Sequence, residues 1–459
     1  AAAIPPARFS IWRRVILFCK FLPLIGQLPG QISVSNHKPA DPSDLYNAGS
    51  IVFIFNNGVP VITRRTFLGG ASAACAVSAT STSVLAKIIP HTKASHEAND
   101  PASLVDITIG TGGHGHLFPG AVVPFGAVQL SPDTFNDGWD WCSGYHISDT
   151  SIMGFSHTHL SGTGCGDLLD FLVMPGTGES KLVPGPRSNP DEGYRSRFDH
   201  QDEHAEPGYY SVLLKDYGIH AEMTATERTG LHRYTFPSGK GAPKSGHIIV
   251  DLLHGYQTAK GEPTVVTASL QRTAPDTLAG GRTTNAWGNG REVHFTMQFS
   301  QKPTRIAFYK DDVEVPAGTQ PLTGKSLKCV LFFDLTRNPV ILVKTGISGV
   351  SAKSAGNNLK TELPGWDFER VRGDARSAWN KQLSRIQITT DNEEHRRIFH
   401  AAVYHASLGP VLFDDADGTY RGMDKQNHKL DPGQRNYTAF SLWDTFRAEQ
   451  PLYNLLYPE

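Results

Sequence analysis

The spacing of apolar residues between residues 104 and 368 restricts the fold more than any other feature. Short segments alternate apolar and polar residues with a period of two, and Gly, Pro, Asn and Asp separate them. No helical repeat of useful length intervenes, so we predict a large antiparallel β-sandwich over residues 104–368. The segments expected to be strands are 121–130, 170–175, 209–214, 220–226, 231–237, 247–252, 292–299 and 330–333.

The apolar period changes after about residue 365. Val371, Ala375, Trp379, Leu383 and Ile386 recur at intervals of three and four, which is the pattern of one apolar face of a helix. The sequence therefore predicts a helical linker over residues 369–390.

A second helical region is expected from residue 391 onward. Asp391 and Glu394 have the form of a capping box, and the helix that they begin is expected to end at Gly409-Pro410. Residues 437–456 have a further helical pattern, interrupted by Pro451. We therefore expect residues 391–459 to be the start of a helical domain that continues in a longer protein.

Composition narrows the class of protein. A chain of 459 residues is too long for one ordinary core, so two domains are expected. The net charge of −1 gives no reason to expect a nucleic-acid partner. The five cysteines are too few and too scattered for a disulfide framework; they are Cys19, Cys75, Cys142, Cys165 and Cys329.

The first 62 residues do not have the pattern of a folded domain. Residues 13–19 are basic and then apolar, but the apolar run is far shorter than the roughly 20 residues that a membrane-spanning helix needs. We therefore expect an unstructured or wrongly translated leader over residues 1–62 and no transmembrane segment.

An export signal is predicted over residues 63–86. Arg64-Arg65 precede a weakly apolar stretch that ends in Ser83-Val84-Leu85-Ala86, which is the order of a twin-arginine signal peptide. Cleavage after Ala86 would leave residues 87–103 as a linker and place the protein in the periplasm or outside the cell. The residues before Cys75 form a poor lipidation motif, and lipidation at this position stays an open alternative.

Glycine, histidine and aromatic residues are concentrated between residues 109 and 174. Glycines let a backbone turn sharply or approach a ligand closely. Trp139, Trp141 and Tyr145 combine flat apolar faces with a polar edge, which suits a sugar ring. We interpret them as a partly exposed aromatic platform, and ordinary core packing is the alternative.

Two clusters raise metal hypotheses. The pairs His114/His116 and His157/His159 would each lie on one face of a strand, as zinc ligands could. Neither pair has a Cys-x-x-Cys partner, so we favour hydrogen-bonding or ligand-contacting histidines over zinc. The aspartates of residues 414–417 faintly resemble a calcium loop but lack the bidentate glutamate of an EF-hand, so we favour a solvated turn.

Several ordered motifs together resemble glycoside hydrolase family 92, the calcium-dependent, exo-acting α-mannosidases. They include Gly112-Gly113-His114-Gly115-His116, Gly138-Trp139-Asp140 and Ser441-Leu442-Trp443-Asp444. The resemblance extends over about 350 residues and excludes about the first 100. The full set of matching segments is 109–121, 123–126, 138–140, 142–146, 154–164, 206–210, 224–228, 232–234 and 440–447.

The resemblance implies an architecture and a mechanism. A β-sandwich would be joined by helices to an (α/α)6 barrel, with residues 391–459 as an incomplete beginning of that barrel. Such enzymes invert the anomeric carbon, with a general acid and a general base about 6.5–9.5 Å apart, and they use Ca2+ to hold mannose hydroxyls. The acid, the base and most calcium ligands are expected beyond Glu459, so no residue is assigned to them.

The resemblance also implies substrate contacts on this chain. Asp444 would bind the hydroxyls of the terminal mannose, Trp139 would form a wall of the sugar site, and Cys142 and His157 are further candidates. The implied function is release of mannose from α-linked oligosaccharides or N-glycans, with the 459-residue chain inactive alone. A non-catalytic carbohydrate-binding sandwich and an exported zinc hydrolase are the alternatives.

Overall fold

The computed structural model describes residues 51–54 and 100–457, apart from residues 259, 317 and 439–441. The predicted export signal, and all of the predicted leader except Ile51–Ile54, lie outside the described residues. The chain divides into two compact units. One unit comprises Val105–Gln382 and His400–Ala439, and the other comprises Ala1–Leu104, Leu383–Phe399 and Phe440–Glu459.

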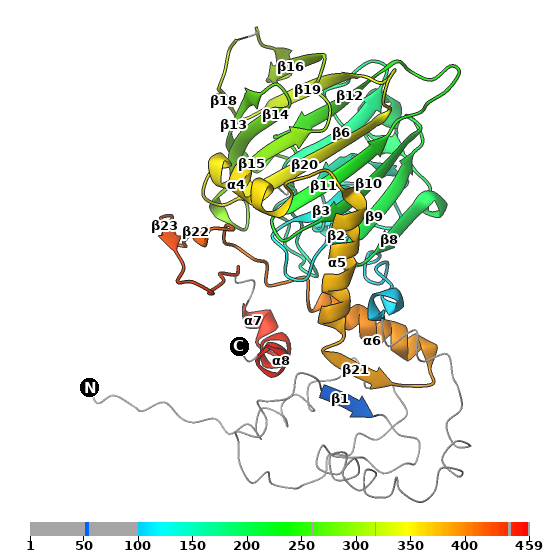
Figure 1. The fold of residues 1–459 in the computed structure, drawn as a ribbon, viewed down its shortest axis with the longest axis vertical. Coiled ribbons are helices and arrows are strands. Elements are labelled where there is room, and N and C mark those ends of the chain that lie inside the picture. Colours follow the sequence, from blue (N-terminus) through cyan, green and yellow to red (C-terminus); the bar gives the residue numbers. More distant parts are fainter. Residues whose placement is uncertain (1–50, 55–99, 259, 317, 439–441, 458–459) are drawn as a thin grey trace, which may run out of the picture. The chain divides into compact units, whose positions relative to one another are not determined.

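The first unit contains two large sheets, which confirms the predicted β-sandwich (Figure 1). The nine-stranded sheet has the order β18 (Leu322–Gly324), β13 (Val265–Ala274), β14 (Thr277–Asn285), β15 (Asn289–Phe299), β20 (Val340–Ser348), β11 (Thr229–Thr235), β10 (Ile219–Ala225), β9 (Tyr209–Leu214) and β8 (Glu203–Glu206). The eight-stranded sheet has the order β17 (Val313–Glu314), β16 (Arg305–Lys310), β19 (Leu327–Asp334), β12 (Ser245–Asp251), β6 (Leu172–Thr177), β5 (Gly154–Ser156), β3 (Gln129–Asp133) and β2 (Ala121–Val122). Strands β4 (Ser151–Ile152) and β7 (Ser196–Arg197) form a separate two-stranded sheet.

Alternation along the strands determines which side chains enter the core. In β15, Phe295, Met297 and Phe299 are buried, and the residues between them are partly exposed. Met297 pairs with Leu278 of β14, and Phe299 pairs with Val343 of β20. A slip of one residue would turn every one of these side chains to the other face, so the buried pattern fixes the register.

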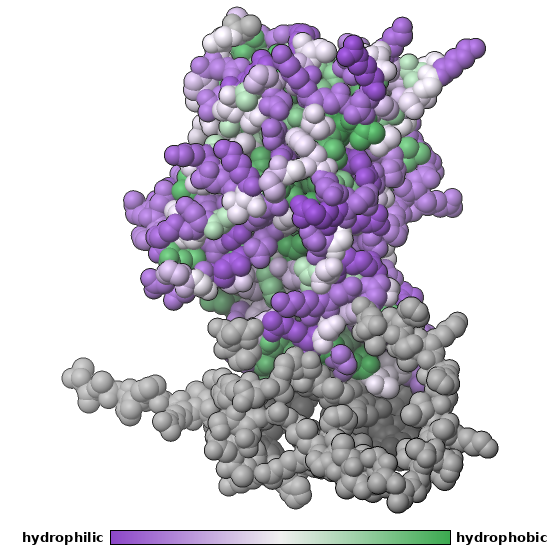
Figure 2. Space-filling view, viewed as in Figure 1, coloured by the Kyte–Doolittle hydropathy of each residue, from purple (hydrophilic) through white to green (hydrophobic). Residues whose placement is uncertain are grey.

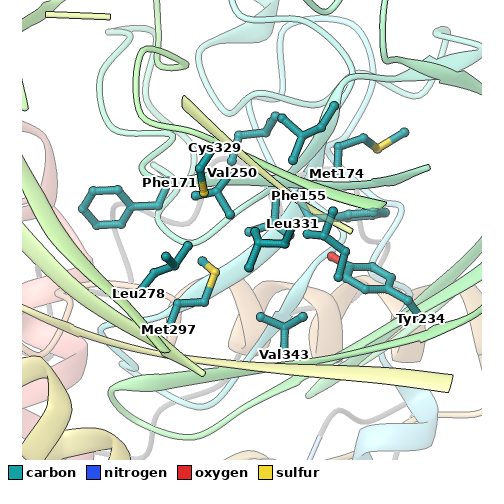
Figure 3. Close-up of a cluster of buried hydrophobic side chains, with 14 of the residues drawn as sticks. Phe155, Phe171, Met174, Tyr234, Val250, Leu278, Met297, Cys329, Leu331 and Val343 are labelled. Atoms are coloured by element: carbon teal, nitrogen blue, oxygen red, sulfur yellow. The ribbon is translucent and has the colours of Figure 1, made fainter. Parts of the chain in front are cut away.

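The core lies between the two sheets. Figure 3 shows side chains of both sheets converging on one another: Leu278, Met297 and Val343 come from the nine-stranded sheet, and Val250 and Leu331 come from the eight-stranded sheet. All five are fully buried. The face of this unit seen in Figure 2 is mostly hydrophilic, as expected when the apolar faces of both sheets are buried against each other.

The segment predicted as one strand over residues 121–130 forms two. β2 ends at Val122 and β3 begins at Gln129, and Phe125 between them has a φ of 57°. A bulky residue in the left-handed region cannot continue a strand, so the chain turns here. The sequence prediction missed this turn because Pro124 and Gly126 lie inside an otherwise apolar run.

Helix α4 (Ala352–Glu362) lies within the region where no helix was predicted, so that prediction is wrong. Ser351 caps it, since the Ser351 hydroxyl accepts a hydrogen bond from the Ser354 amide. The helix packs so closely on β20 that a Cβ on Gly346 would lie 2.2 Å from the Ala355 carbonyl oxygen. Mostly small and polar residues form α4, and its apolar face is therefore too narrow to be recognised in the sequence.

Helix α5 (Phe368–Leu383) carries four of the five residues of the predicted stripe. Trp379 is fully buried; its indole N–H donates to the Val122 carbonyl over 2.6 Å, and its ring packs on Tyr404 at 4.4 Å. The fifth residue, Ile386, lies in strand β21 (Ile386–Thr389), which pairs in parallel with β1 (Ile51–Ile54). The prediction of one helix through Ile386 is therefore wrong.

The last helices are α6 (Glu393–His405), α7 (Leu442–Thr445) and α8 (Glu449–Leu456). Pro451 lies in the first turn of α8, where a missing amide hydrogen costs no helical bond. Tyr437 forms an isolated bridge with Leu412, so the predicted helix begins later than residue 437. Among the residues that the structure describes, no helix is long and apolar enough to cross a membrane.

A buried ion-pair network connects the end of β10 with α4 and the segment after α6. Arg228 donates to Glu362 over 2.8 Å and to the Asp414 carboxylate, and its Nε donates to the Asp414 carbonyl over 2.5 Å. Arg435 donates to the neighbouring Glu227 over 2.8 Å. The side chains of Arg228 and Asp414 are nearly inaccessible to water and that of Glu362 is partly buried, so these charges depend on one another for compensation.

The network predicts a stability effect for Arg228→Met. This substitution keeps much of the side-chain volume but leaves the buried Asp414 and the partly buried Glu362 carboxylates with less compensation, and should lower the free energy of unfolding by about 3 kcal/mol. Urea denaturation of both proteins measures the difference. Arg305→Met is the matched control, because the Arg305–Glu314 pair is largely exposed and its loss should cost less than about 1 kcal/mol. Equal effects of the two substitutions would contradict the prediction.

Candidate functional site

A short turn presents one tryptophan to solvent. Trp139–Trp141 form a 3-10 turn, η4, that begins after Gly138, whose φ of 84° favours glycine. The Trp141 indole N–H donates to Asp149 over 2.7 Å, and the guanidinium of Arg187 lies 4.4 Å from its ring centroid. Trp141 is thereby anchored, whereas Trp139 exposes 54% of its surface.

The predicted platform is therefore smaller than the sequence indicated. Tyr145 is buried and donates its hydroxyl hydrogen to Glu203, so it belongs to the protein interior. Trp141 is only partly accessible and is held by its own polar partners. Of the three aromatic residues, Trp139 alone offers an exposed ring.

Two histidines and a glycine hold the Trp139 indole. Its ring centroid lies 4.8 Å from that of His114 and 4.6 Å from that of His116, which meets it edge-on. His114 Nδ1 is 2.5 Å from the Asp140 carboxylate. A Cβ on Gly164 would lie 2.5 Å from the Trp139 indole nitrogen, so only glycine leaves room for the ring.

His116 supports the indole from inside the protein. The residue is buried with a φ of 54°, and its Nε2 has no hydrogen-bond partner among the described residues. Burial lowers the pKa of His116, which favours the neutral imidazole. His114 and His116 therefore act as ring contacts of Trp139.

Cys142 lies at the end of the same turn but is buried. Its thiol is 3.8 Å from the Tyr256 hydroxyl, which in turn donates to the Gly138 carbonyl over 3.0 Å. Burial raises the pKa of the Cys142 thiol, so the sulfur is a protonated, packed group. The structure places Cys142 beneath the turn that carries Trp139 rather than on an exposed surface.

His157 lies in the sandwich core and not on a sugar-accessible surface. Its Nδ1 donates to the Phe171 carbonyl over 2.9 Å, and its Nε2 lies 3.0 Å from Nε2 of His232. The Tyr234 hydroxyl lies 2.8 Å from Nδ1 of His232. One chain of hydrogen bonds satisfies all four ring nitrogens: Tyr234 donates to His232, His232 donates to His157, and His157 donates to the Phe171 carbonyl. Both imidazoles are then neutral, and each of their nitrogens is hydrogen-bonded.

A buried carboxylate joins two further histidines. Asp133 accepts from His159 over 2.8 Å and from His254 over 2.7 Å, and all three side chains are almost fully buried. Burial alone would raise the pKa of Asp133, but the charge and hydrogen bonds of His159 and His254 lower it. A Cβ on Gly144 would lie 2.3 Å from this carboxylate, so the cluster also supports the loop after η4.

Arg282 holds the loop that leads into β6. It donates to Asp170 over 2.7 Å and to the carbonyl oxygens of Leu168 and Leu169 over 3.1 Å each. Leu168, Leu169 and Phe171 have φ values of 69°, 57° and 57°, a left-handed conformation that costs roughly 1–2 kcal/mol per residue. The bonds of Arg282 offset this cost and fix the loop.

The same loop carries a second ion pair. The Asp170 carboxylate accepts a hydrogen bond from Arg291 Nη2 over 2.6 Å and another from the Thr158 hydroxyl over 2.5 Å. Burial would raise the pKa of Asp170, but the two arginines hold it well below its usual range. Asp170 is therefore an ionised structural carboxylate that is paired with both arginines.

The aspartates of residues 414–417 do not form a solvated turn throughout, which corrects the sequence interpretation. Asp414 is buried against Arg228, and Asp415 accepts from Ser348 over 2.8 Å and from Asn358 over 2.7 Å. Only Asp417 is exposed. Their oxygens are already used by protein donors, so this segment does not fit a calcium site.

The histidine pairs likewise do not form a zinc site. The rings of His114 and His116 pack against Trp139, and His157 and His159 each bond to other groups. Among the described residues, no group of three His, Cys, Asp or Glu side chains is arranged to hold a metal ion. No described residue is therefore assigned as a metal ligand.

Comparison with known families identifies the chain. Residues 104–348 match the glycosyl hydrolase family 92 N-terminal domain, and residues 354–459 match the family 92 catalytic domain. The chain belongs to glycosyl hydrolase family 92. The resemblance read from the sequence motifs is thereby confirmed.

Solved family 92 structures resemble the chain along most of its length. An α-mannosidase from Bacteroides thetaiotaomicron, solved in complex with mannoimidazole, is 41% identical with a TM-score of 0.72; the match covers 77% of this chain and 46% of that one. An inverting mannosidase from Bacteroides thetaiotaomicron VPI-5482 is 26% identical with a TM-score of 0.65, covering 78% of this chain and 46% of that one.

A curated relative from a fungus also matches. An uncharacterized secreted glycosidase of Arthroderma benhamiae is 30% identical over 340 residues, which cover 68% of this chain and 42% of the relative. The chain thus spans less than half the length of the relatives and structures that it matches.

The candidate residues of this family 92 chain are distributed over both units. Trp139 and Cys142 lie in one turn of the sandwich unit, and His157 lies in the core of that unit. Asp444 belongs to α7 in the other unit. Sequence reasoning missed Asp133, His254 and Arg282, because the His254–Asp133 and Arg282–Asp170 partners are more than 100 positions apart in the chain.

The neutral His157–His232 pair predicts a dependence of stability on pH. Burial lowers the pKa of folded His157 to about 4 from 6.5, so its contribution is complete above pH 6.5 and is lost as the pH falls toward 4. The expected loss from this residue is about 3 kcal/mol of unfolding free energy. His157→Gln cannot take up the proton, so its unfolding free energy should fall less steeply over this range. Denaturation curves at pH 7, 5.5 and 4.5 measure both slopes, and parallel slopes would refute the assignment.

Proposed function

We propose that the whole protein is an exo-acting α-mannosidase that releases mannose from α-linked oligosaccharides or N-glycans. The 41% identity to a family 92 α-mannosidase that binds mannoimidazole carries this proposal. The exposed, preset Trp139 ring supports it, because a flat apolar face suits the less polar face of a sugar. The match of residues 354–459 to the family's catalytic domain favours a hydrolase over a non-catalytic binding sandwich.

The residues of this chain would bind and orient the sugar. Trp139 would lie against the ring of the terminal mannose, and the carboxylate of Asp444 would accept hydrogen bonds from its hydroxyls. Holding the sugar in one orientation is itself catalytic, since a reacting bond must meet its acid and base in a fixed geometry. No proton transfer is assigned to a described residue.

We further propose that the reaction inverts the anomeric carbon and needs calcium. One solved relative is named an inverting mannosidase, which supports the stereochemistry. Inversion requires an acid and a base on opposite faces of the sugar with room for water between them. Calcium prefers clustered oxygen ligands, and the described aspartates of this chain do not provide them, so the requirement rests on the family resemblance.

Export is also part of the proposal. The curated relative is named a secreted glycosidase, and Arg64-Arg65 begin the sequence pattern of a twin-arginine signal. A periplasmic or extracellular enzyme would meet α-mannosides released from glycans outside the cytoplasm.

The central test is mannose release by the whole protein. We expect release from an α-linked mannobiose, a first product with the β configuration by proton NMR, and loss of activity in excess chelator that added Ca2+ restores. The 459-residue chain alone, assayed in parallel, should release no mannose. Absence of mannose release by the whole protein would refute the proposed function. Full activity in chelator would refute only the calcium requirement, and an α product would refute inversion.

Substitution of Asp444 tests the assigned sugar contact. Asp444→Ala and Asp444→Asn should each lower kcat/KM by more than about tenfold, because lost hydroxyl contacts misplace the sugar. Asp374→Ala is the matched control, since Asp374 is an exposed helical carboxylate that pairs with Arg370, one turn earlier in the same helix. Wild-type kinetics for both Asp444 variants would remove Asp444 from the site.

A further inference from the structure

A second tryptophan is presented to solvent in the same unit as Trp139. Trp287 lies in the turn between β14 and β15 and exposes 44% of its surface. Gly288 follows it, and Gly290 has a φ of 62°. One exposed indole does not by itself mark a binding surface, but an exposed ring that is held near a second one can contact the same ligand.

Buried groups fix the position of this turn. The Gly288 amide donates to Asp167 over 2.7 Å, and the other Asp167 oxygen accepts from the Leu168 amide over 2.7 Å. Asp167 is itself buried. Arg291, at the base of the turn, donates to Asp170 over 2.6 Å. The turn is therefore bonded at two points to the loop that leads into β6.

That loop also contacts Trp139. Gly164 lies against the Trp139 indole nitrogen, and Asp167, three residues later, holds the Trp287 turn. Three residues span at most about 10 Å, so the supports of the two exposed indoles are close neighbours. The turns that carry the two exposed indoles are therefore supported by one short loop of the same unit.

We propose that Trp287 binds a sugar of the leaving group. The inference rests on the proposed function, in which Trp139 contacts the terminal mannose of an exo-acting enzyme. No sugar precedes a terminal residue, so every other sugar of the substrate lies on the leaving-group side. Trp287 is the exposed aromatic ring that the Asp167 loop holds for such a sugar, and aromatic rings with a few polar neighbours are typical of ligand sites.

The test compares two substrates in the whole protein. An α-linked mannotriose has leaving-group sugars, whereas the leaving group of α-mannosyl fluoride is one atom. Trp287→Ala should lower kcat/KM for mannotriose about fivefold, mainly through a higher KM. Its kcat/KM for mannosyl fluoride should stay within about twofold of the wild-type value. Trp287→Phe keeps an aromatic face and should lose less. Val313→Ala removes an exposed apolar side chain in β17 and should change neither substrate.

The outcomes separate this inference from the proposed function. An equal loss of kcat/KM for both substrates, or no loss for mannotriose, would overturn the role of Trp287. If the equal loss comes with a lowered melting temperature, the ring instead packs against polypeptide. A wild-type enzyme that cleaves neither substrate refutes the proposed function. Calorimetric binding of mannotriose then still decides the inference, since unchanged affinity in Trp287→Ala would overturn it and weakened affinity would support it.

Discussion

The bond between Arg282 and Asp170 determines how the loops of the sandwich unit are arranged. Arg282 belongs to β14 of one sheet, and Asp170 lies just before β6 of the other, so the pair joins the two layers across the core. Nη2 of Arg282 donates to two backbone oxygens of a loop with three left-handed residues, and its Nη1 donates to the carbonyl oxygens of Leu252 and His254. Without that arginine, the buried Asp170 carboxylate would keep Arg291 and Thr158 but lose one charged donor, and several carbonyls would each lose a donor at the same time. Both exposed tryptophans depend on this loop.

Buried polar groups divide into two kinds in this unit. Asp170 and Asp414 form ion pairs with arginines, whereas His157 and His232 are neutral and joined in one chain of donors. Each arrangement satisfies groups that an apolar core would otherwise leave unpaired. The interior of the sandwich is consequently specified by directional bonds as well as by apolar packing.

The sequence was sufficient for the layered fold, because alternation over strands such as β15 reports a buried face directly. It failed where the deciding contact is distant or the local pattern weak. Helix α4 is small and polar on most of its surface, and Ile386 continues a helical spacing after the helix has ended. For the site, the Gly-Trp-Asp motif located Trp139 correctly as an exposed ring. Burial of Cys142 and His157 depends on Tyr256 and His232, which no local spacing reveals.

The packing around Trp139 has a consequence for binding. His114, His116 and Gly164 together leave the indole little freedom to change rotamer. Immobilising a flexible side chain on association costs about 0.5–1.5 kcal/mol. Here folding has already restricted the ring, so a ligand that settles on it need not order it. The free energy of that contact is therefore not reduced by the cost of ordering this side chain, even though the surface offered is no larger than one aromatic face.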